Sequence, residues 1–333
     1  MRIQFEDMVQ EFKRVLVKKG FSEEDAYESA KLFAENSLDG VYSHGLNRFP
    51  RVIEYIDKGY IDVKAKAEKI DGFGALERWE GNLGMGNLNA KIAMDRAIEL
   101  SRQYGVGVVA LRNTNHWMRG GSYGWQAANA GCIGICWTNT MPNMPAWGAK
   151  DRRIGNNPFI MAIPRSNGQH VVVDTAMSQF SYGKIESYRL AGKQLPVVGG
   201  YDTEGNLTTD PVEIEKTWRV LPIGFWKGSG MSIAFDLIAA VLSSGLSTSE
   251  IGNNEAEYGL SQVFIAIDPK KFYSEGTTYD IIDRVLKDLK ESEPAEEGGR
   301  ISYPGERTLA TRRYNLENGI PVVKEIWEAI KKM

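Results

Sequence analysis

The chain has 333 residues, 42% of them hydrophobic and 25% charged, which is enough apolar material to bury a full core. Its 40 Lys and Arg residues nearly balance 43 Asp and Glu residues, and the formal net charge of -3 argues against nucleic acid or an anionic membrane as a partner. The N-terminal residues lack the apolar centre of a signal peptide, so we expect a cytoplasmic protein.

The first 60 residues have the periodicity of helices. Apolar spacing predicts a helix over 5–19, and Ser22 before three acidic residues predicts the N-cap of a second helix over 23–39. A third helix is predicted over 46–58, with a start that puts Pro50 in its first turn.

From about residue 70 the pattern changes to short β-branched runs between glycines. These runs predict strands at 106–111, 132–138, 159–164, 170–174 and 262–268. Helical spacing lies between them at 88–104, 122–130 and 229–242. The last 50 residues return to helix, so we predict an α+β fold in which residues 1–72 and 285–333 form a helical domain and 73–284 form a sheet domain.

Two cysteines, Cys132 and Cys136, fall in one predicted strand. They would point to the same face about 13 Å apart, at about 3.3 Å per residue, which is too far for a disulfide. No second cysteine pair accompanies them and the chain has three histidines, so we expect reduced core residues and no metal site.

The segment from Ser43 to Arg48 is the first candidate for chemistry. If it is helical, His44 and Arg48 are four residues apart and project from one face. The imidazole could then protonate a carbonyl oxygen while the guanidinium binds a neighbouring carboxylate. The alternative is structural: Ser43 caps the helix, His44 is a surface residue, and Arg48 pairs with Glu54 or with water.

The other two histidines lie further along the chain. His116 directly follows the strand 106–111, where a sheet delivers residues to a cleft, and glycines 120 and 121 follow it. A hydrogen-bonded loop histidine beside a packing tryptophan is the alternative. His170 lies within a predicted strand, which favours a structural role.

A nicotinamide cofactor would need a binding frame other than a Rossmann motif. Neither Gly84-Met85-Gly86 nor Gly228-Ser229-Gly230 continues to the third glycine of G-x-G-x-x-G, and no Walker lysine loop is present. Lys227 and the start of the following helix could bind a diphosphate, whereas a plain glycine turn is the alternative.

Several segments together resemble the type 2 malate/L-lactate dehydrogenase family, a non-Rossmann group of NAD(P)-dependent 2-keto-acid reductases. The likeness covers essentially the whole chain in order. The segments that carry it are SHGLNRFPR (43–51), LRNTNHWMRGGSYGWQA (111–127), RIGNNPF (153–159), FWKGSGMSIAFDL (225–237) and YPGER (303–307).

The resemblance implies roles for individual residues. His44 matches the family's proton donor, and His116 a second histidine to which some members assign the acid–base role. The implied substrate-binding residues are Ser43, Arg48, Trp117 and Thr140. Thr140 departs from the lysine common in ureidoglycolate and malate enzymes, which puts those substrates in doubt. The implied cofactor-binding residues are His170, Val171, Val172, Val173, Asp174, Thr175, Ala176, Trp226, Lys227, Gly305, Glu306 and Arg307.

The resemblance further implies hydride transfer from NAD(P)H to the ketone of a small anionic 2-keto acid, with NADH as the preferred cofactor and NADPH as the alternative. It also implies a mainly antiparallel sheet and a homodimer. Two rival functions remain open from the sequence: the same chemistry on ureidoglycolate, malate, lactate or sulfolactate, and a protein that binds a sugar acid without catalysis.

Overall fold

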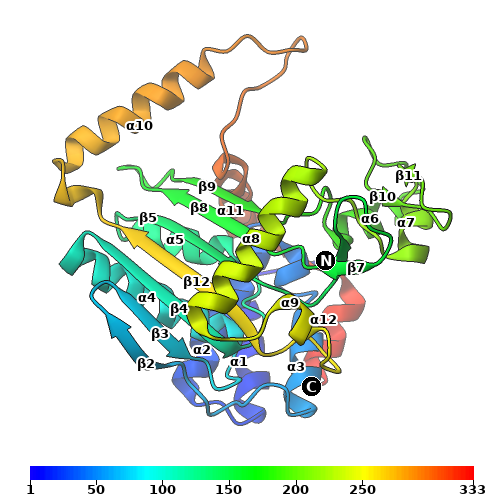
Figure 1. The fold of residues 1–333 in the computed structure, drawn as a ribbon, viewed down its shortest axis with the longest axis horizontal. Helices are drawn as coiled ribbons and strands as arrows, with labels where there is room; N and C mark the ends of the chain where they lie inside the picture. The colour runs from blue at the N-terminus through cyan, green and yellow to red at the C-terminus, as the bar shows by residue number, and fades with distance from the viewer.

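A seven-stranded mixed sheet forms the centre of the computed structural model, which describes residues 1–333 (Figure 1). Its strands, in spatial order, are β2 (Glu68–Phe73), β3 (Leu76–Glu80), β4 (Val106–Thr114), β12 (Leu260–Ile267), β5 (Ile133–Thr138), β8 (Phe159–Ile163) and β9 (Val171–Thr175). Only the β3–β4 pair is parallel. The α+β class and the five predicted strands are confirmed. The sequence does not predict β2, which is exposed along its whole length, or β3, whose residues LERWE include no β-branched side chain.

Helices cover both faces of this sheet. On one face, α4 (Gly86–Tyr104) and α5 (Gly121–Asn129) pack against a core that includes Phe264. The neighbouring residue Val263 points to the opposite face, where Ala239 of α8 (Trp226–Ser243) contacts it. Because residues alternate between faces along a strand, a sheet covered twice needs the continuously apolar runs of the sequence.

Both ends of the chain contribute to a second core beside the sheet. It joins α1 (Phe5–Lys18), α2 (Glu23–Leu38), α3 (Phe49–Asp57) and α12 (Lys324–Lys331). Phe12 stacks on Phe49 with ring centroids 4.3 Å apart, and β1 (Arg2–Ile3) pairs with β13 (Ile320–Pro321). The three N-terminal helices are therefore as predicted, and Ser22 caps the second by accepting the Asp25 amide.

The remaining elements connect these two cores or build a smaller third one. They are η1 (Tyr42–His44), β6 (Met144–Pro145), β7 (Arg152–Ile154), α6 (Tyr182–Leu190), β10 (Gly200–Tyr201), β11 (Leu207–Thr208), α7 (Pro211–Thr217), α9 (Thr248–Ile251), η2 (Pro269–Lys271), α10 (Glu275–Lys290) and α11 (Glu306–Asn318). In the third core, Met144 of β6, Ile185 of α6 and Ile214 of α7 are buried. Helix α10 projects away from the body of the molecule (Figure 1), so the residues from 285 to the end of α10 lie apart from the N-terminal helices. The exact domain boundaries stay a prediction.

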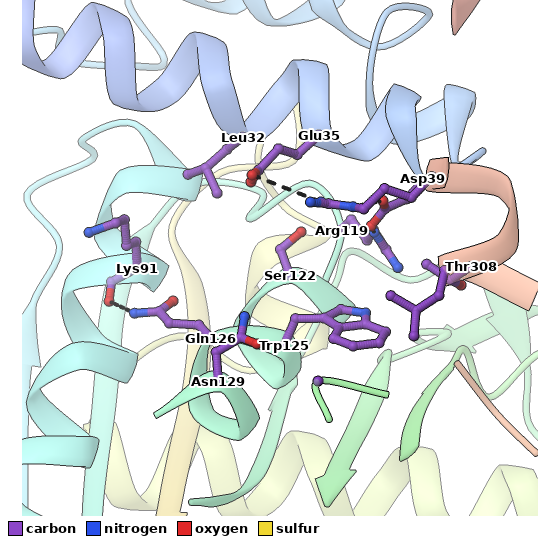
Figure 2. Close-up of a pocket in the computed structure, with 13 residues that line it drawn as sticks. Leu32, Glu35, Asp39, Lys91, Arg119, Ser122, Trp125, Gln126, Asn129 and Thr308 are labelled. Carbon is purple, nitrogen blue, oxygen red and sulfur yellow. Dashed lines mark hydrogen bonds and ion pairs between the residues drawn. The ribbon is translucent and has the colours of Figure 1, made fainter. Parts of the chain in front are cut away.

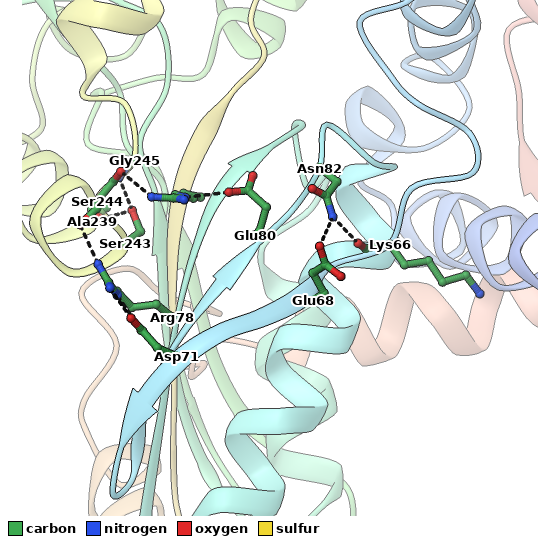
Figure 3. Close-up of polar contacts among 11 residues, drawn as sticks. Lys66, Glu68, Asp71, Arg78, Glu80, Asn82, Ala239, Ser243, Ser244 and Gly245 are labelled. Carbon is green, nitrogen blue, oxygen red and sulfur yellow. Dashed lines mark hydrogen bonds and ion pairs between the residues drawn. The ribbon is translucent and has the colours of Figure 1, made fainter.

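Polar contacts fix the β2–β3 edge of the sheet to the end of α8 (Figure 3). Arg78 of β3 donates to Asp71 of β2 at 2.7 Å and to the Ser244 hydroxyl at 2.9 Å. Arg112 of β4 similarly donates to Glu80 at 2.8 Å and to the backbone oxygen of Ser244 at 3.2 Å. Charged pairs along an edge strand also discourage pairing with strands of other chains.

None of the helices combines the length and the apolar character needed to cross a membrane. No group of three or more His, Cys, Asp or Glu side chains is arranged to hold a metal ion. Cys132 and Cys136 are free and buried in the same core cluster, as expected.

Candidate active site

The two histidines proposed from separate loops lie beside each other. His44 ends η1 and His116 follows β4, and their rings stack with centroids 5.8 Å apart and planes 19° apart. Burial lowers the pKa of His116, and it lowers the pKa of His44 to about 4, with the positive charges of Arg48 and Arg119 adding to the effect on His44. Both imidazoles are therefore neutral at neutral pH in the free protein.

The hydrogen bond of His116 favours its neutral form. Its Nδ1 accepts the backbone N–H of Met118 at 3.0 Å, so a neutral His116 carries its proton on Nε2. A second proton on Nδ1 would set two N–H donors against each other. His116 is thus arranged as a neutral hydrogen-bond donor.

His44 has a partner that suits either protonation state. Its Nδ1 lies 3.1 Å from the hydroxyl oxygen of Ser43. A hydroxyl can donate to an unprotonated ring nitrogen and can accept from a protonated one. His44 can therefore gain and lose a proton without losing this contact, which makes it the better suited of the two histidines to act as an acid.

Arg48 lies in a separate element from His44, so the single helix considered for this pair is not formed. Arg48 immediately precedes α3, whose start is set by Pro50 in its first turn. The Arg48 side chain is 22% exposed, and its nearest acid is Glu257, at 3.8 Å, rather than Glu54. None of its N–H donors has a hydrogen-bond acceptor within the chain. A guanidinium with unused donors is well suited to bind a carboxylate ligand in two-pronged fashion.

Glu257 connects Arg48 to the loop that contains Thr140. The Glu257 side chain is 10% exposed and accepts the Met141 amide at 3.2 Å. Thr140 is buried, and its amide donates to the Asn157 side chain at 3.1 Å. The loop after β5 is therefore held next to the arginine by a carboxylate that no sequence motif identified, because NNEAEYG is typical of a surface loop.

Trp117 occupies a different position from that expected for a substrate contact. Its side chain is 1% exposed and packs in the sheet core against Tyr123 and Phe264. Its backbone oxygen accepts the Tyr123 hydroxyl at 2.6 Å. This location supports a packing role that holds the His116 loop, in place of the substrate contact implied by the resemblance.

Gly45 holds the His44 turn against α2, because there is no room for a side chain. A Cβ at this position would lie 2.8 Å from the Ser37 amide nitrogen and 2.9 Å from the Phe33 carbonyl oxygen, both of which are helix backbone. We expect Gly45→Ala to lower the free energy of unfolding by about 1–3 kcal/mol, as overpacking does. Urea unfolding measures this change. In Gly276→Ala the added carbon meets nothing within 4 Å, and equal losses in both variants would contradict the prediction.

A polar cavity of about 280 Å³ lies between α2, α5 and α11, and neither His44 nor His116 lines it (Figure 2). Arg119 is 5% exposed on its wall and forms an ion pair with Asp39, which also accepts Arg312 Nε at 2.6 Å. The Arg119 Nε is 3.7 Å from Asp174 of β9. This network, buried at Arg119 and Asp39, joins the helical core, the His116 loop and the edge strand of the sheet.

The three segments expected to bind the cofactor follow one edge of the sheet. Pro304 accepts the amide of Val172 at 2.9 Å, and a Cβ on Gly305 would meet the His170 carbonyl oxygen at 2.9 Å. At the other end of β9, Ile223 donates to the Met177 carbonyl at 2.8 Å, a few residues before α8 begins. Residues 305–307 and 226–227 therefore lie near opposite ends of the strand 171–175.

Some side chains along this edge are already hydrogen-bonded within the protein, and others are free to contact a ligand. His170 is 4% exposed and uses both ring nitrogens, since Nδ1 accepts the Arg165 amide at 2.8 Å and Nε2 lies 2.9 Å from Asn129 Oδ1. Its side chain is structural. In contrast, Trp226 is 62% exposed, and Lys227 next to it has no ion-pair partner in the chain. The lysine and the edge strand would fit an elongated ligand that carries phosphates.

Comparison with known proteins connects this geometry to a family. The family model described as malate/L-lactate dehydrogenase matches residues 3–331. A 2,3-diketo-L-gulonate reductase of Escherichia coli O17:K52:H18 (strain UMN026 / ExPEC) is 50% identical over 334 residues, covering 100% of both chains. The sulfolactate dehydrogenase structure from Methanocaldococcus jannaschii is 31% identical with a TM-score of 0.90, covering 100% of this chain and 96% of that one. For malate dehydrogenase from Entamoeba histolytica the identity is 26%, the TM-score 0.94 and the coverage 100% and 96%.

Proposed function

Because the chain belongs to the malate/L-lactate dehydrogenase family of NAD(P)-dependent oxidoreductases, we propose that it reduces 2,3-diketo-L-gulonate at its 2-keto group to 3-dehydro-L-gulonate. The observation that carries this proposal is the 50% identity, over the full length of both chains, to a reductase of that name. The segments 115–128 and 189–197 resemble such reductases as well. Reduction of another 2-keto acid is the alternative that a substrate panel would reveal.

Arg48, His116 and His44 have separate roles in this reaction. Arg48 binds the substrate carboxylate through its unused N–H donors and so fixes the ketone next to the two imidazoles. His116 donates a hydrogen bond from Nε2 to the ketone oxygen. His44 delivers the proton to that oxygen as negative charge develops on it, while Ser43 Oγ stays bound to His44 Nδ1.

A nicotinamide cofactor supplies the hydride when bound. The residues that would hold it are the strand His170 to Ala176, Trp226 with Lys227, and the start of α11 at Gly305, Glu306 and Arg307. Asp174 is partly exposed on this edge, and a carboxylate there would bind ribose hydroxyls and repel a 2′-phosphate. This charge supports NADH over NADPH.

We also propose a homodimer. Helix α8 has an apolar outer face in which Leu237 is 58% and Val241 is 74% exposed, and Val285 on the projecting α10 is 63% exposed. Apolar surface of this kind on two elements supports burial against a second copy. Light scattering after size exclusion would give twice the mass of the chain, and a monomer at micromolar concentration would contradict the proposal.

Loss of NADH absorbance tests the function directly. The assay compares NADH and NADPH with 2,3-diketo-L-gulonate, pyruvate, oxaloacetate and oxalurate. Highest kcat/KM for the diketo acid with NADH is the expected result. Faster reduction of a different acid would replace the substrate assignment, and no oxidation by folded protein with any acid would favour a binding protein without catalysis.

A further inference from the structure

The start of α6 connects the two sides of the histidine site. The Tyr182 hydroxyl donates to the carbonyl oxygen of Asn143, whose side chain donates in turn to the Thr140 hydroxyl at 3.3 Å. At the next residue, a Cβ on Gly183 would lie 3.7 Å from the Cβ of Ser43, the neighbour of His44. Two consecutive residues therefore connect the loop after β5 to the His44 turn, and Gly183 and Ser43 face each other at the exposed side of the histidine site.

Nothing in the backbone requires glycine at position 183. Gly183 is the second residue of a nine-residue helix, and its φ is not in the left-handed region. Ser43 is the only residue that a Cβ would approach within 4 Å, at an ordinary contact distance. Glycine is also among the least favourable residues within a helix. The missing side chain therefore leaves open space beside Ser43 without any benefit to the local fold.

The proposed substrate is long enough to extend into the space beside Ser43. Its carboxylate and 2-keto group take up Arg48 and the two histidines, and four further carbons with their oxygens extend beyond the reacting ketone. We propose that Gly183 keeps open the space beside Ser43 for this extension, so that it determines the length of keto acid that the site accepts. This inference rests on the proposed function.

Replacement of Gly183 by leucine tests the inference, with Gly183→Ala as a smaller step should leucine prevent folding. Gly276→Leu is a matched control, because Gly276 is likewise the second residue of a helix capped by serine and has nothing within 4 Å. The measurements are kcat/KM with NADH for 2,3-diketo-L-gulonate and for the best-reduced acid among pyruvate, 2-ketobutyrate and oxaloacetate. Where no short acid is reduced, the inhibition constant of pyruvate replaces the second value.

We expect Gly183→Leu to lower kcat/KM for the six-carbon acid at least about tenfold, equivalent to about 1.4 kcal/mol, with the value for the short acid within about twofold of wild type. Gly183→Ala lowers kcat/KM for the six-carbon acid by a smaller factor, and Gly276→Leu changes kcat/KM for neither acid. If the ratio of kcat/KM for the six-carbon acid to kcat/KM for the short acid is the same in Gly183→Leu as in wild type, the inference is overturned. This applies both when neither kcat/KM changes and when the two fall together. Failure of wild type to reduce the six-carbon acid is a separate result that removes the proposed function, and this inference with it.

Discussion

Replacing His44 by alanine lowers kcat for the diketo acid by about 100- to 10,000-fold, the range expected when a general acid is removed. The physical reason is that His44 can hold a proton on Nδ1 against the Ser43 hydroxyl, whereas the Met118 amide prevents this in His116. Single-turnover reduction measures the loss, and NADH fluorescence on titration checks that the cofactor still binds.

His116→Ala is the matched comparison for this result. Removing a neutral hydrogen-bond donor is expected to lower kcat less than removing the acid, because His44 still delivers its proton. The pH dependence of the residual activity also differs: the His116 variant keeps the decline of activity with rising pH that wild type shows, and the His44 variant loses it. A His44 variant with near-normal kcat beside an inactive His116 variant would exchange the two roles.

The pH profile of wild type follows from the low pKa of His44 in the free protein. With a pKa of about 4, the protonated fraction falls about tenfold for each pH unit above it, so kcat/KM for reduction declines from pH 6 to pH 8 with a slope near −1 on logarithmic axes. The bound substrate carboxylate offsets the charge of Arg48 and raises this pKa, so kcat declines at higher pH than kcat/KM does. If kcat/KM did not change between pH 6 and pH 8, protonation of His44 in the free enzyme would not be required for the reaction.

Replacing Arg48 by methionine lowers kcat/KM by about 100-fold, equivalent to about 3 kcal/mol for truncation of one partner in a charged pair. Methionine keeps most of the aliphatic length but has no donors, and Glu257, 3.8 Å from the guanidinium, would then repel the substrate carboxylate. Most of the loss is expected in KM, with a smaller loss in kcat because the ketone is no longer fixed.

Two further variants test the cause of that loss. Arg48→Lys keeps the charge but not the two-pronged geometry, and recovers part of the affinity. Arg51→Met removes an arginine one turn away, whose guanidinium donates to Tyr55 on the exposed side of α3, and leaves KM unchanged. Equal increases in KM for the Arg48 and Arg51 variants would mean that general positive charge, and not the Arg48 contact, binds the substrate.

Local patterns in the sequence were sufficient for most of the secondary structure. Strands such as 159–163 and 171–175 are short β-branched runs bounded by turn residues, and Ser22 and Pro50 fix helix starts through their own hydrogen-bonding and ring geometry. The sequence also determined that no Rossmann motif is present and which histidines follow turns or strands. These features depend on residues that are close together in the chain, so the sequence is sufficient to reveal them.

Contacts between distant segments required the tertiary structure. The stacking of His44 on His116, the pairing of Arg48 with Glu257, and the approach of Gly183 to Ser43 each join segments far apart in sequence, and no periodicity encodes such distances. The sequence could not show that Trp117 packs in the core either, because burial depends on which helices cover the sheet. The protonation preferences of the two histidines likewise follow from the Met118 amide and the Ser43 hydroxyl, which only the folded backbone orients.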